Sequence, residues 1–218
     1  MAGKKEKNGL GARVWAALLS FGLIGQIAWV VENMYFNVFL YNTVTGDTGM
    51  IAAMVAASAA VAAVTTLAVG ALSDKLGKRK PIIVTGYLLW GLSVMAFALV
   101  NVSGLEMLLG PVKAVQAAAV LVIVLDCVMT FFGSSANDAA FNAWVTDVTD
   151  DGNRGRVESV LAAMPLVAML VVFGALDGLT ARGHWGLFFL IVGGLTILGG
   201  GLGRVLIQEP ASLRRAEG

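Results

Sequence analysis

Long apolar runs alternate with short polar or glycine-rich breaks and divide the chain into six segments. A membrane-spanning helix needs about 20 mostly apolar residues, and each segment reaches roughly that length. The segments are too long for barrel strands, lack strict alternation and are rich in alanine and leucine, so they predict helices. They lie at about 14–41, 50–72, 82–100, 115–143, 158–178 and 186–206. The pattern predicts an all-α membrane protein with six transmembrane helices.

Basic residues in the breaks predict the orientation of these helices. Of the 15 lysines and arginines, only Lys113 and Arg182 lie in the second set of alternating loops. Cytoplasmic loops retain positive charge, so both termini are expected on the cytoplasmic side of the cell (plasma or inner) membrane. We therefore expect a cytoplasmic tail at 1–13, a bundle at 14–207 and a second tail, or the start of a central loop, at 208–218. The residues that set this orientation are Lys4, Lys5, Lys7, Arg13, Lys75, Lys78, Arg79, Lys80, Arg154, Arg156, Arg204, Arg214 and Arg215.

Composition excludes several classes of protein. The chain is 58% apolar and 13% charged, which is not the balance of a soluble domain. A net charge of +1 leaves no basic excess for nucleic acid. The one histidine, His184, lies in a loop, and the sequence has no zinc-protease, serine-hydrolase or phosphate-loop motif. We expect neither catalytic residues, nor a metal site, nor a cofactor.

Polar residues on the first segment are spaced as a stripe. Gln26, Asn33 and Asn37 are 7 and 4 residues apart, which at 100° per residue places them within about 40° of arc. Glu32 lies about 120° from this stripe and is expected to be either a cavity acid or part of a satisfied buried pair. Hydrogen bonding that only holds helices together is the alternative explanation of such a stripe.

The fourth segment carries a comparable polar line. Asp126, Thr130, Asn137 and Trp144 recur at spacings of 4, 7 and 7. A lone intramembrane carboxylate marks an ion or proton pathway more often than a packing contact, which singles out Asp126. Asp138 lies about 120° from Asp126 and is expected to pair with a basic loop near the cytoplasmic end.

Small residues mark two of the segments as packing surfaces. The second segment has Ala52, Ala53, Ala56, Ala57, Ala59, Ala60, Ala62 and Ala63, and the sixth has Gly193, Gly194, Gly199, Gly200, Gly201 and Gly203.

The break at residues 70–81 combines two glycines, an acid and four bases. Gly70 and Gly77 are spaced to allow close helix contact and a tight reversal. Asp74 is unfavourable near a helix C-terminus unless a cation or the N-terminus of another helix faces it. Positive charge in a cytoplasmic loop explains the bases but not this acid.

This segment resembles the signature loop of the major facilitator superfamily, whose pattern is Gly-x-Leu-small-Asp-basic-x-Gly-basic-basic. Residues 147–156 are similar to the family's loop between helices four and five, where an Arg-Gly pair opens helix five. Residues 77–81 and 137–142 look most like the sugar and cation symporters related to the melibiose carrier. The matching positions of the signature loop are Gly70, Leu72, Ser73, Asp74, Lys75, Gly77, Lys78 and Arg79.

The resemblance implies a secondary transporter that works by alternating access and moves a small polar solute such as a sugar. Asp126, together with Glu32, would couple transport to H+ or Na+. The residues that would bind the solute are Gln26, Asn33, Asn37, Thr130 and Asn137. The residues that would form a cytoplasmic latch between the two halves are Gly70, Asp74, Gly77, Lys78, Arg79, Asp138 and Arg154.

The resemblance covers about residues 14–207, which is half of a twelve-helix fold built from two bundles. A second six-helix half is therefore expected as a partner, besides the lipid bilayer. It could belong to the same longer chain, to a second copy or to a separate subunit. The alternative is a non-transporting six-helix subunit that assembles with a partner bundle.

Overall fold

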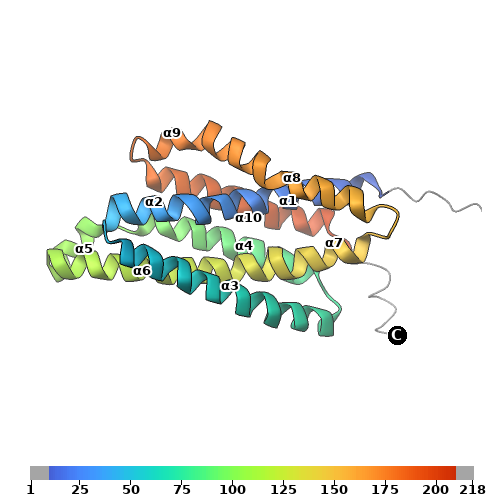
Figure 1. Cartoon of the computed structure of the whole chain (residues 1–218), viewed down its shortest axis with the longest axis horizontal. Coiled ribbons are helices and arrows are strands. Elements are labelled where there is room, and N and C mark those ends of the chain that lie inside the picture. Colours follow the sequence, from blue (N-terminus) through green and yellow to red (C-terminus); the bar gives the residue numbers. More distant parts are fainter. Residues whose placement is uncertain (1–9, 210–218) are drawn as a thin grey trace, which may run out of the picture.

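The computed structural model describes residues 10–209 and contains six helices that are long and apolar enough to cross a membrane. These helices follow the six predicted segments in order and run side by side along the long axis of the molecule (Figure 1). We call them spans 1 to 6. Their bounds are Ala12–Val44, Thr48–Leu76, Lys80–Leu99, Pro111–Val148, Arg154–Thr180 and Trp185–Leu206. The prediction of six helices and no strands is confirmed for the described residues.

Several spans are interrupted by π-helical turns, written η. Span 1 consists of α1 (Ala12–Val30), η1 (Val31–Phe36), α2 (Asn37–Phe39) and η2 (Leu40–Val44). Span 2 is α3 (Thr48–Leu76), and span 3 is α4 (Lys80–Ala96) followed by the 3-10 turn η3 (Phe97–Leu99). A short helix that the sequence pattern did not predict, α5 (Val102–Leu109), precedes span 4, which consists of α6 (Pro111–Gly133), η4 (Ser134–Phe141) and α7 (Asn142–Val148). Span 5 is α8 (Arg154–Val171), η5 (Val172–Leu176) and α9 (Asp177–Thr180), and span 6 is α10 (Trp185–Leu206).

Local sequence signals set the helix ends. The Asp47 carboxylate accepts a hydrogen bond from the Gly49 amide at 2.8 Å and caps the start of α3. That helix stops at Gly77, whose φ of 60° lies in the left-handed region that residues with a Cβ avoid. Pro111 occupies the first turn of α6, where its missing N–H has no intrahelical partner to lose.

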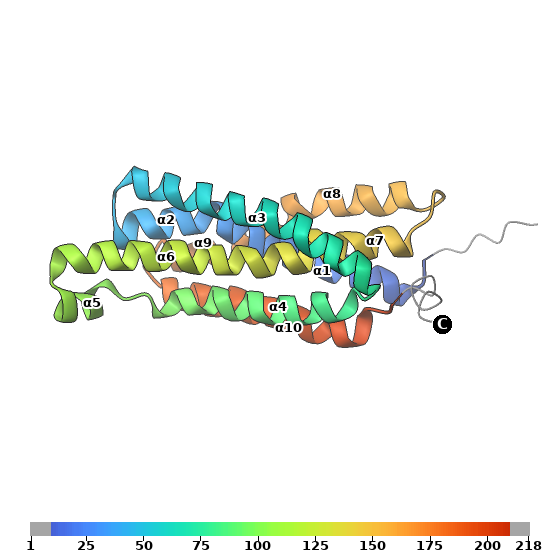
Figure 2. The same ribbon diagram turned by 90° about the horizontal axis from the view of Figure 1, so that it is seen from below.

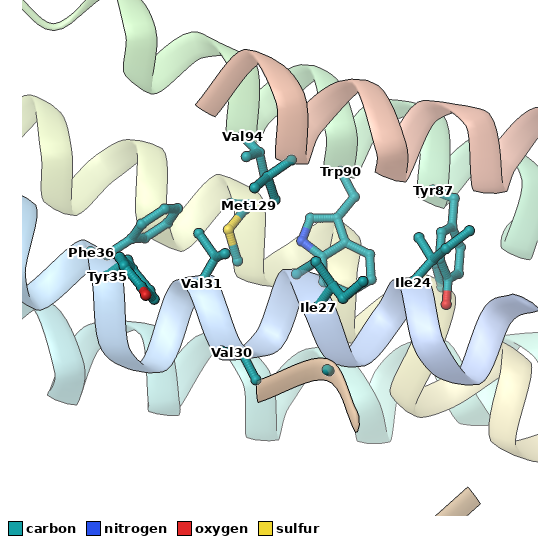
Figure 3. Packing of buried hydrophobic residues seen from close by; sticks show 14 of the residues in the cluster. Ile24, Ile27, Val30, Val31, Tyr35, Phe36, Tyr87, Trp90, Val94 and Met129 are labelled. Carbon is teal, nitrogen blue, oxygen red and sulfur yellow. The ribbon is translucent and has the colours of Figure 1, made fainter. Parts of the chain in front are cut away.

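The core is apolar and rich in aromatic rings that lie between spans 1, 3 and 4 (Figure 3). Trp90 and Val94 of α4 and Met129 of α6 are fully buried, and they pack toward Ile27 and Val31 of span 1. The Trp29 and Trp90 ring centroids are 5.0 Å apart. This core fixes the relative positions of the two spans that carry most of the polar residues.

Glycines bring α4 and α10 into close contact. A Cβ built on Gly193 would lie 2.5 Å from the Gly91 carbonyl oxygen, and one built on Gly200 would lie 2.9 Å from the Leu88 side chain. Gly194 and Gly201, by contrast, have no neighbour within 4 Å of such a Cβ. The predicted packing surface on the sixth segment therefore exists, and it uses one face of the helix.

The faces of α3 and α8 are covered by little of the described chain. Figure 2 shows these two helices on the side of the bundle opposite α4 and α10. Leu67 of α3 is 77% exposed and Leu170 of α8 is 75% exposed. Most of the alanines of the second segment are exposed as well: Ala52, Ala53, Ala56, Ala59, Ala60 and Ala63. Within residues 10–209 these small residues are therefore a surface and not an internal contact.

The basic loops meet at one end of the bundle, which we call the basic end; it carries residues 74–80, 147–154 and 204–209. Five of the residues that set the predicted orientation, Lys4, Lys5, Lys7, Arg214 and Arg215, lie outside the described residues.

Candidate functional site

A cavity of about 260 Å³ lies between spans 1, 2 and 4, on the side where α3 is exposed. Three carboxylates and two asparagines give it a polar wall, and span 2 contributes small and apolar side chains. The lining residues are Trp29, Glu32, Asn33, Asn37, Met54, Val55, Ser58, Ala59, Ala62, Asp126 and Asp138. Among the residues that the structure describes, no lysine, arginine or histidine lines this cavity.

Two of the carboxylates lie close together at the junction of spans 1 and 4. The Thr130 hydroxyl donates a hydrogen bond to Oε1 of Glu32 at 2.7 Å. Oε2 of Glu32 and Oδ1 of Asp126 are buried and have no hydrogen-bond partner. Asp126 is only 2% exposed, so its charge cannot be screened by bulk water. Buried carboxylate oxygens without partners are expensive within a membrane-spanning helix, so this pair is a candidate for a functional role.

The π turns explain why Glu32 and Asp138 belong to this cavity. Glu32 lies in η1 and Asp138 lies in η4. A π turn bonds residue i to i+5 and holds more residues per turn than an α-helix, so it rotates the side chains within and beyond it. The expectation that Asp138 falls outside the face of Asp126 assumed 100° per residue throughout, and it is wrong.

The same rotation separates the predicted polar stripes. Asn33 and Asn37 line the main cavity, whereas Gln26 lines a smaller cavity of about 100 Å³ that also contacts Asn137 and Asp138. The Tyr87 hydroxyl donates to Oδ1 of the Asn137 side chain at 2.9 Å, and Asn137 is buried. The structure therefore places three of the predicted solute-binding residues, Asn33, Asn37 and Thr130, around the two acids and two of them elsewhere.

A second polar cluster lies at the basic end and centres on Arg79, which is 5% exposed. Its guanidinium donates to Oδ1 of Asp74 at 2.7 Å and to Oδ2 of Asp147 at 3.0 Å, and a third hydrogen bond goes to the Ser73 hydroxyl. Burial lowers the pKa of Arg79, but the hydrogen bonds to Asp74 and Asp147 outweigh it, so the pKa lies above its ordinary value. Of the two partners expected for Asp74, a cation or the N-terminus of another helix, the structure shows a cation, Arg79.

The acid from span 4 in this cluster is Asp147 and not the expected Asp138. Asp138 accepts a hydrogen bond from the Asn137 amide at 3.2 Å and lines the central cavity. Asp147 opens the second loop that resembles the family pattern, and this is the sequence signal that could have identified it. Arg154 bonds within its own loop, to Oγ1 of Thr149 and to the Thr146 carbonyl oxygen, both at 3.2 Å.

The segment after span 6 is bound across the basic end, which the sequence did not indicate. The two carboxylate oxygens of Glu209 accept hydrogen bonds from the backbone amides of Lys80 at 2.7 Å and Arg79 at 3.2 Å. The Trp144 indole donates to the Gln208 carbonyl oxygen at 2.9 Å. Glu209 thus caps the start of α4, and the cap comes from a distant part of the chain.

Comparison with known proteins agrees with the geometry. The family model described as Major Facilitator Superfamily matches residues 14–218. Neither the curated proteins nor the solved structures contain a significant match to the chain.

Proposed function

Because the chain belongs to the major facilitator superfamily, a family of membrane transporters, we propose that it forms the N-terminal half of a secondary active transporter. It would move a small polar solute by alternating access, coupled to H+ or Na+. The observation that carries this proposal is the polar cavity between spans 1, 2 and 4, with the unpartnered oxygens of Glu32 and Asp126 inside it.

Asp126 and Glu32 would act as the coupling groups. Both lie in helices that cross the membrane, and Thr130 links one of them to the opposite wall. Such acids are tolerated when they take up a proton, a cation or a solute that completes their hydrogen bonds. Asn33 and Asn37 lie on the same cavity wall and would orient the solute.

The second wall of the transport pathway would come from another six-helix bundle. The exposed faces of α3 and α8 flank the cavity side of the molecule and support such an assembly. The second bundle would belong to a longer chain, a second copy or a separate subunit. The intact mass of the native polypeptide, measured after purification from its own membrane, separates the first case from the other two.

The basic end would face the cytoplasm of the cell membrane, since it carries Arg79, Lys80, Arg154 and Arg204, while Lys113 in the first turn of α6 and Arg182 between α9 and α10 belong to the other set of connections. Asp74 and Gly70 at the end of α3, with Gly77, Lys78 and Arg79 in the turn that follows, would then close against the second bundle in one state of the cycle. Most of the Asp74 side chain (69%) is exposed, which leaves it accessible to such a partner.

The test is uptake by the native-length protein in proteoliposomes. Labelled mono- and disaccharides are supplied with and without an inward H+ or Na+ gradient, for the unmodified protein and for Asp126→Asn. We expect Asp126→Asn to abolish gradient-driven accumulation but retain exchange of labelled for unlabelled solute. Glu106→Gln removes an exposed carboxylate on α5 and serves as the matched control.

Accumulation that survives Asp126→Asn would remove the coupling role from this residue. A non-transporting subunit predicts instead that Asp126→Asn, Glu32→Gln and Asn37→Ala all leave the activity of the assembled complex unchanged.

A further inference from the structure

The unsatisfied atoms of the central cavity are all hydrogen-bond acceptors. Among the described residues five buried side-chain polar atoms have no partner, and three of these belong to residues that line the cavity: Oε2 of Glu32, Oδ1 of Asn37 and Oδ1 of Asp126. Asp126 is 98% buried, given its exposed fraction of 2%. Buried acceptors without donors are rare in native proteins, so their concentration here indicates a ligand that supplies donors.

The donors of the cavity wall are already used by other groups of the protein, including the Trp29 side chain, which is hydrogen-bonded to Asp138. The side-chain amides of Asn33 and Asn37 donate to the carbonyl oxygens of Trp29 and Asn33 at 2.8 and 2.9 Å. The Ser58 hydroxyl donates to the Val55 carbonyl oxygen at 3.3 Å. A solute with acceptors of its own, such as a sugar, therefore finds few donors here, whereas a solute with only donors fits the unpaired oxygens.

The charged groups of the cavity wall also favour a cationic ligand. Its titratable groups are Glu32 from span 1 and Asp126 and Asp138 from span 4, while span 2 contributes Ser58 and no charged group. The described lining contains no cation that could neutralise these acids. In an interior of low dielectric an uncompensated carboxylate attracts a cation strongly.

The cavity has room for more than a bare ion. Its volume is about 260 Å³, whereas one water molecule takes up roughly 30 Å³. No group of three or more histidine, cysteine, aspartate or glutamate side chains within residues 10–209 is arranged to hold a metal ion. Trp29 also lines the cavity, and indole rings attract organic cations.

We infer that the solute carried by this protein is an organic cation with N–H donors, a protonated amine or a guanidinium, whose charged nitrogens bind between Glu32 and Asp126. The inference rests on the proposed function. It narrows the solute of that proposal from any small polar molecule to an organic cation. The nitrogen would donate to Oε2 of Glu32 and Oδ1 of Asp126, and Asn37 would accept a further hydrogen bond.

The experiment compares cations with neutral molecules of the same shape. Binding of 1,4-diaminobutane and of methylguanidinium to the native-length protein in lipid nanodiscs is measured by calorimetry at low ionic strength. The neutral counterparts are 1,4-butanediol and methylurea. We expect at least one cation to bind and neither neutral counterpart to do so. Equal binding of a cation and its counterpart, or no binding of either cation, would overturn the inference without any need for a variant.

Variants then locate the site. We expect Asp126→Asn and Glu32→Gln each to weaken cation binding at least tenfold, while Glu106→Gln leaves it unchanged. Cation binding that is unaffected by both substitutions, in proteins that elute as folded single species, would also overturn the inference.

Flux measurements separate this inference from the proposed function. Gradient-driven sugar uptake that neither cation inhibits would leave the transporter standing and overturn the cationic solute. Specific cation binding through Asp126, without movement of the cation into proteoliposomes, would support the cation site and contradict transport.

Discussion

The Thr130 hydroxyl on span 4 donates a hydrogen bond to Glu32 on span 1 across 2.7 Å. This contact joins the two helices that carry the acids of the central cavity. It satisfies one carboxylate oxygen of Glu32 and leaves the other, Oε2, without a hydrogen-bond partner. Thr130 therefore holds the Glu32 carboxylate by one of its two oxygens.

We expect Thr130→Val to lower the affinity for the solute, with a smaller effect on the stability of the fold. The substitution keeps the shape of the side chain but removes its donor, so Glu32 loses its orientation. A hydrogen bond to a charged group contributes about 1.5–3 kcal/mol, and part of this loss should appear as lower thermal stability. Binding affinity and unfolding temperature are measured on the same preparation.

Thr196→Val is the matched control, because Thr196 is equally buried but its hydroxyl bonds only to the Val192 carbonyl oxygen of its own helix. We expect this control to leave solute binding intact. Equal losses of binding in the two variants would show that Thr130 has no special role at the site.

Adjacent glycines on α10 should respond oppositely to the same change. An added methyl group on Gly193 would press on the Gly91 carbonyl oxygen, so Gly193→Ala should destabilise the protein by about 1–3 kcal/mol, as overpacking does. Gly194 has open space around it, and Gly194→Ala should stabilise by up to about 1 kcal/mol because alanine favours the helix. Thermal unfolding in detergent measures both, and a loss for Gly194→Ala as large as for Gly193→Ala would contradict the close contact of α4 and α10.

The sequence predicted the six spans well because hydrophobic length is a property of each segment alone. It also predicted that Asp74 needs either a cation or the N-terminus of another helix as a partner, since the need arises from the helix end on which Asp74 lies. The positions of Asn137 and Asp138 could not be obtained this way, and Glu32 was left open between a cavity acid and a satisfied buried pair. These positions depend on π turns at 31–36 and 134–141, where the rotation per residue differs from that of an α-helix.

Contacts between distant parts of the chain could not be predicted from the sequence either. Glu209 caps a helix that begins 129 residues earlier, and no local pattern distinguishes it from an ordinary polar residue after a membrane span. The sequence pattern singled out Asp138 as the partner of a basic loop and did not indicate Asp147. Only the packing of span 4 against the loop at 70–81 decides between them.

Arg79→Gln should lower stability by about 2–4 kcal/mol, because it leaves the buried side of the cluster at the basic end without its cation. Asp147→Asn should lower the free energy of unfolding more than Asp74→Asn does. The reason is that the Asp147 side chain is 22% exposed and the Asp74 side chain 69% exposed. Chemical denaturation of the three variants provides the ranking. If Asp74→Asn proved the more harmful of the two for the isolated fold, the cluster would be organised differently from the one described.

Two glycines of the loop at 70–81 should separate folding from transport. Gly77→Ala places a Cβ at a φ of 60° and should destabilise by about 1–2 kcal/mol. Gly70 lies within α3, and a Cβ built on it has no neighbour within 4 Å. Gly70→Ala should therefore stabilise the bundle by about 0.5–1 kcal/mol. If a second bundle packs on Gly70, the same variant should nevertheless lose transport. A Gly70→Ala protein that transports normally would argue against close contact at this position.

Glu209→Gln tests whether the segment after span 6 holds the start of α4. The carboxylate accepts from two backbone amides at a helix N-terminus, where negative charge is favourable. Glutamine has one acceptor oxygen and no charge, so the variant should lose about 0.5–2 kcal/mol of stability. The Arg79 and Lys80 amides should exchange with deuterium faster, which peptide-resolved hydrogen exchange detects.

Gln208→Ala is the control, because the bond from Trp144 goes to the backbone oxygen of Gln208 and survives the substitution. Unchanged exchange at Arg79 and Lys80 in Glu209→Gln would mean that α4 starts without help from this segment.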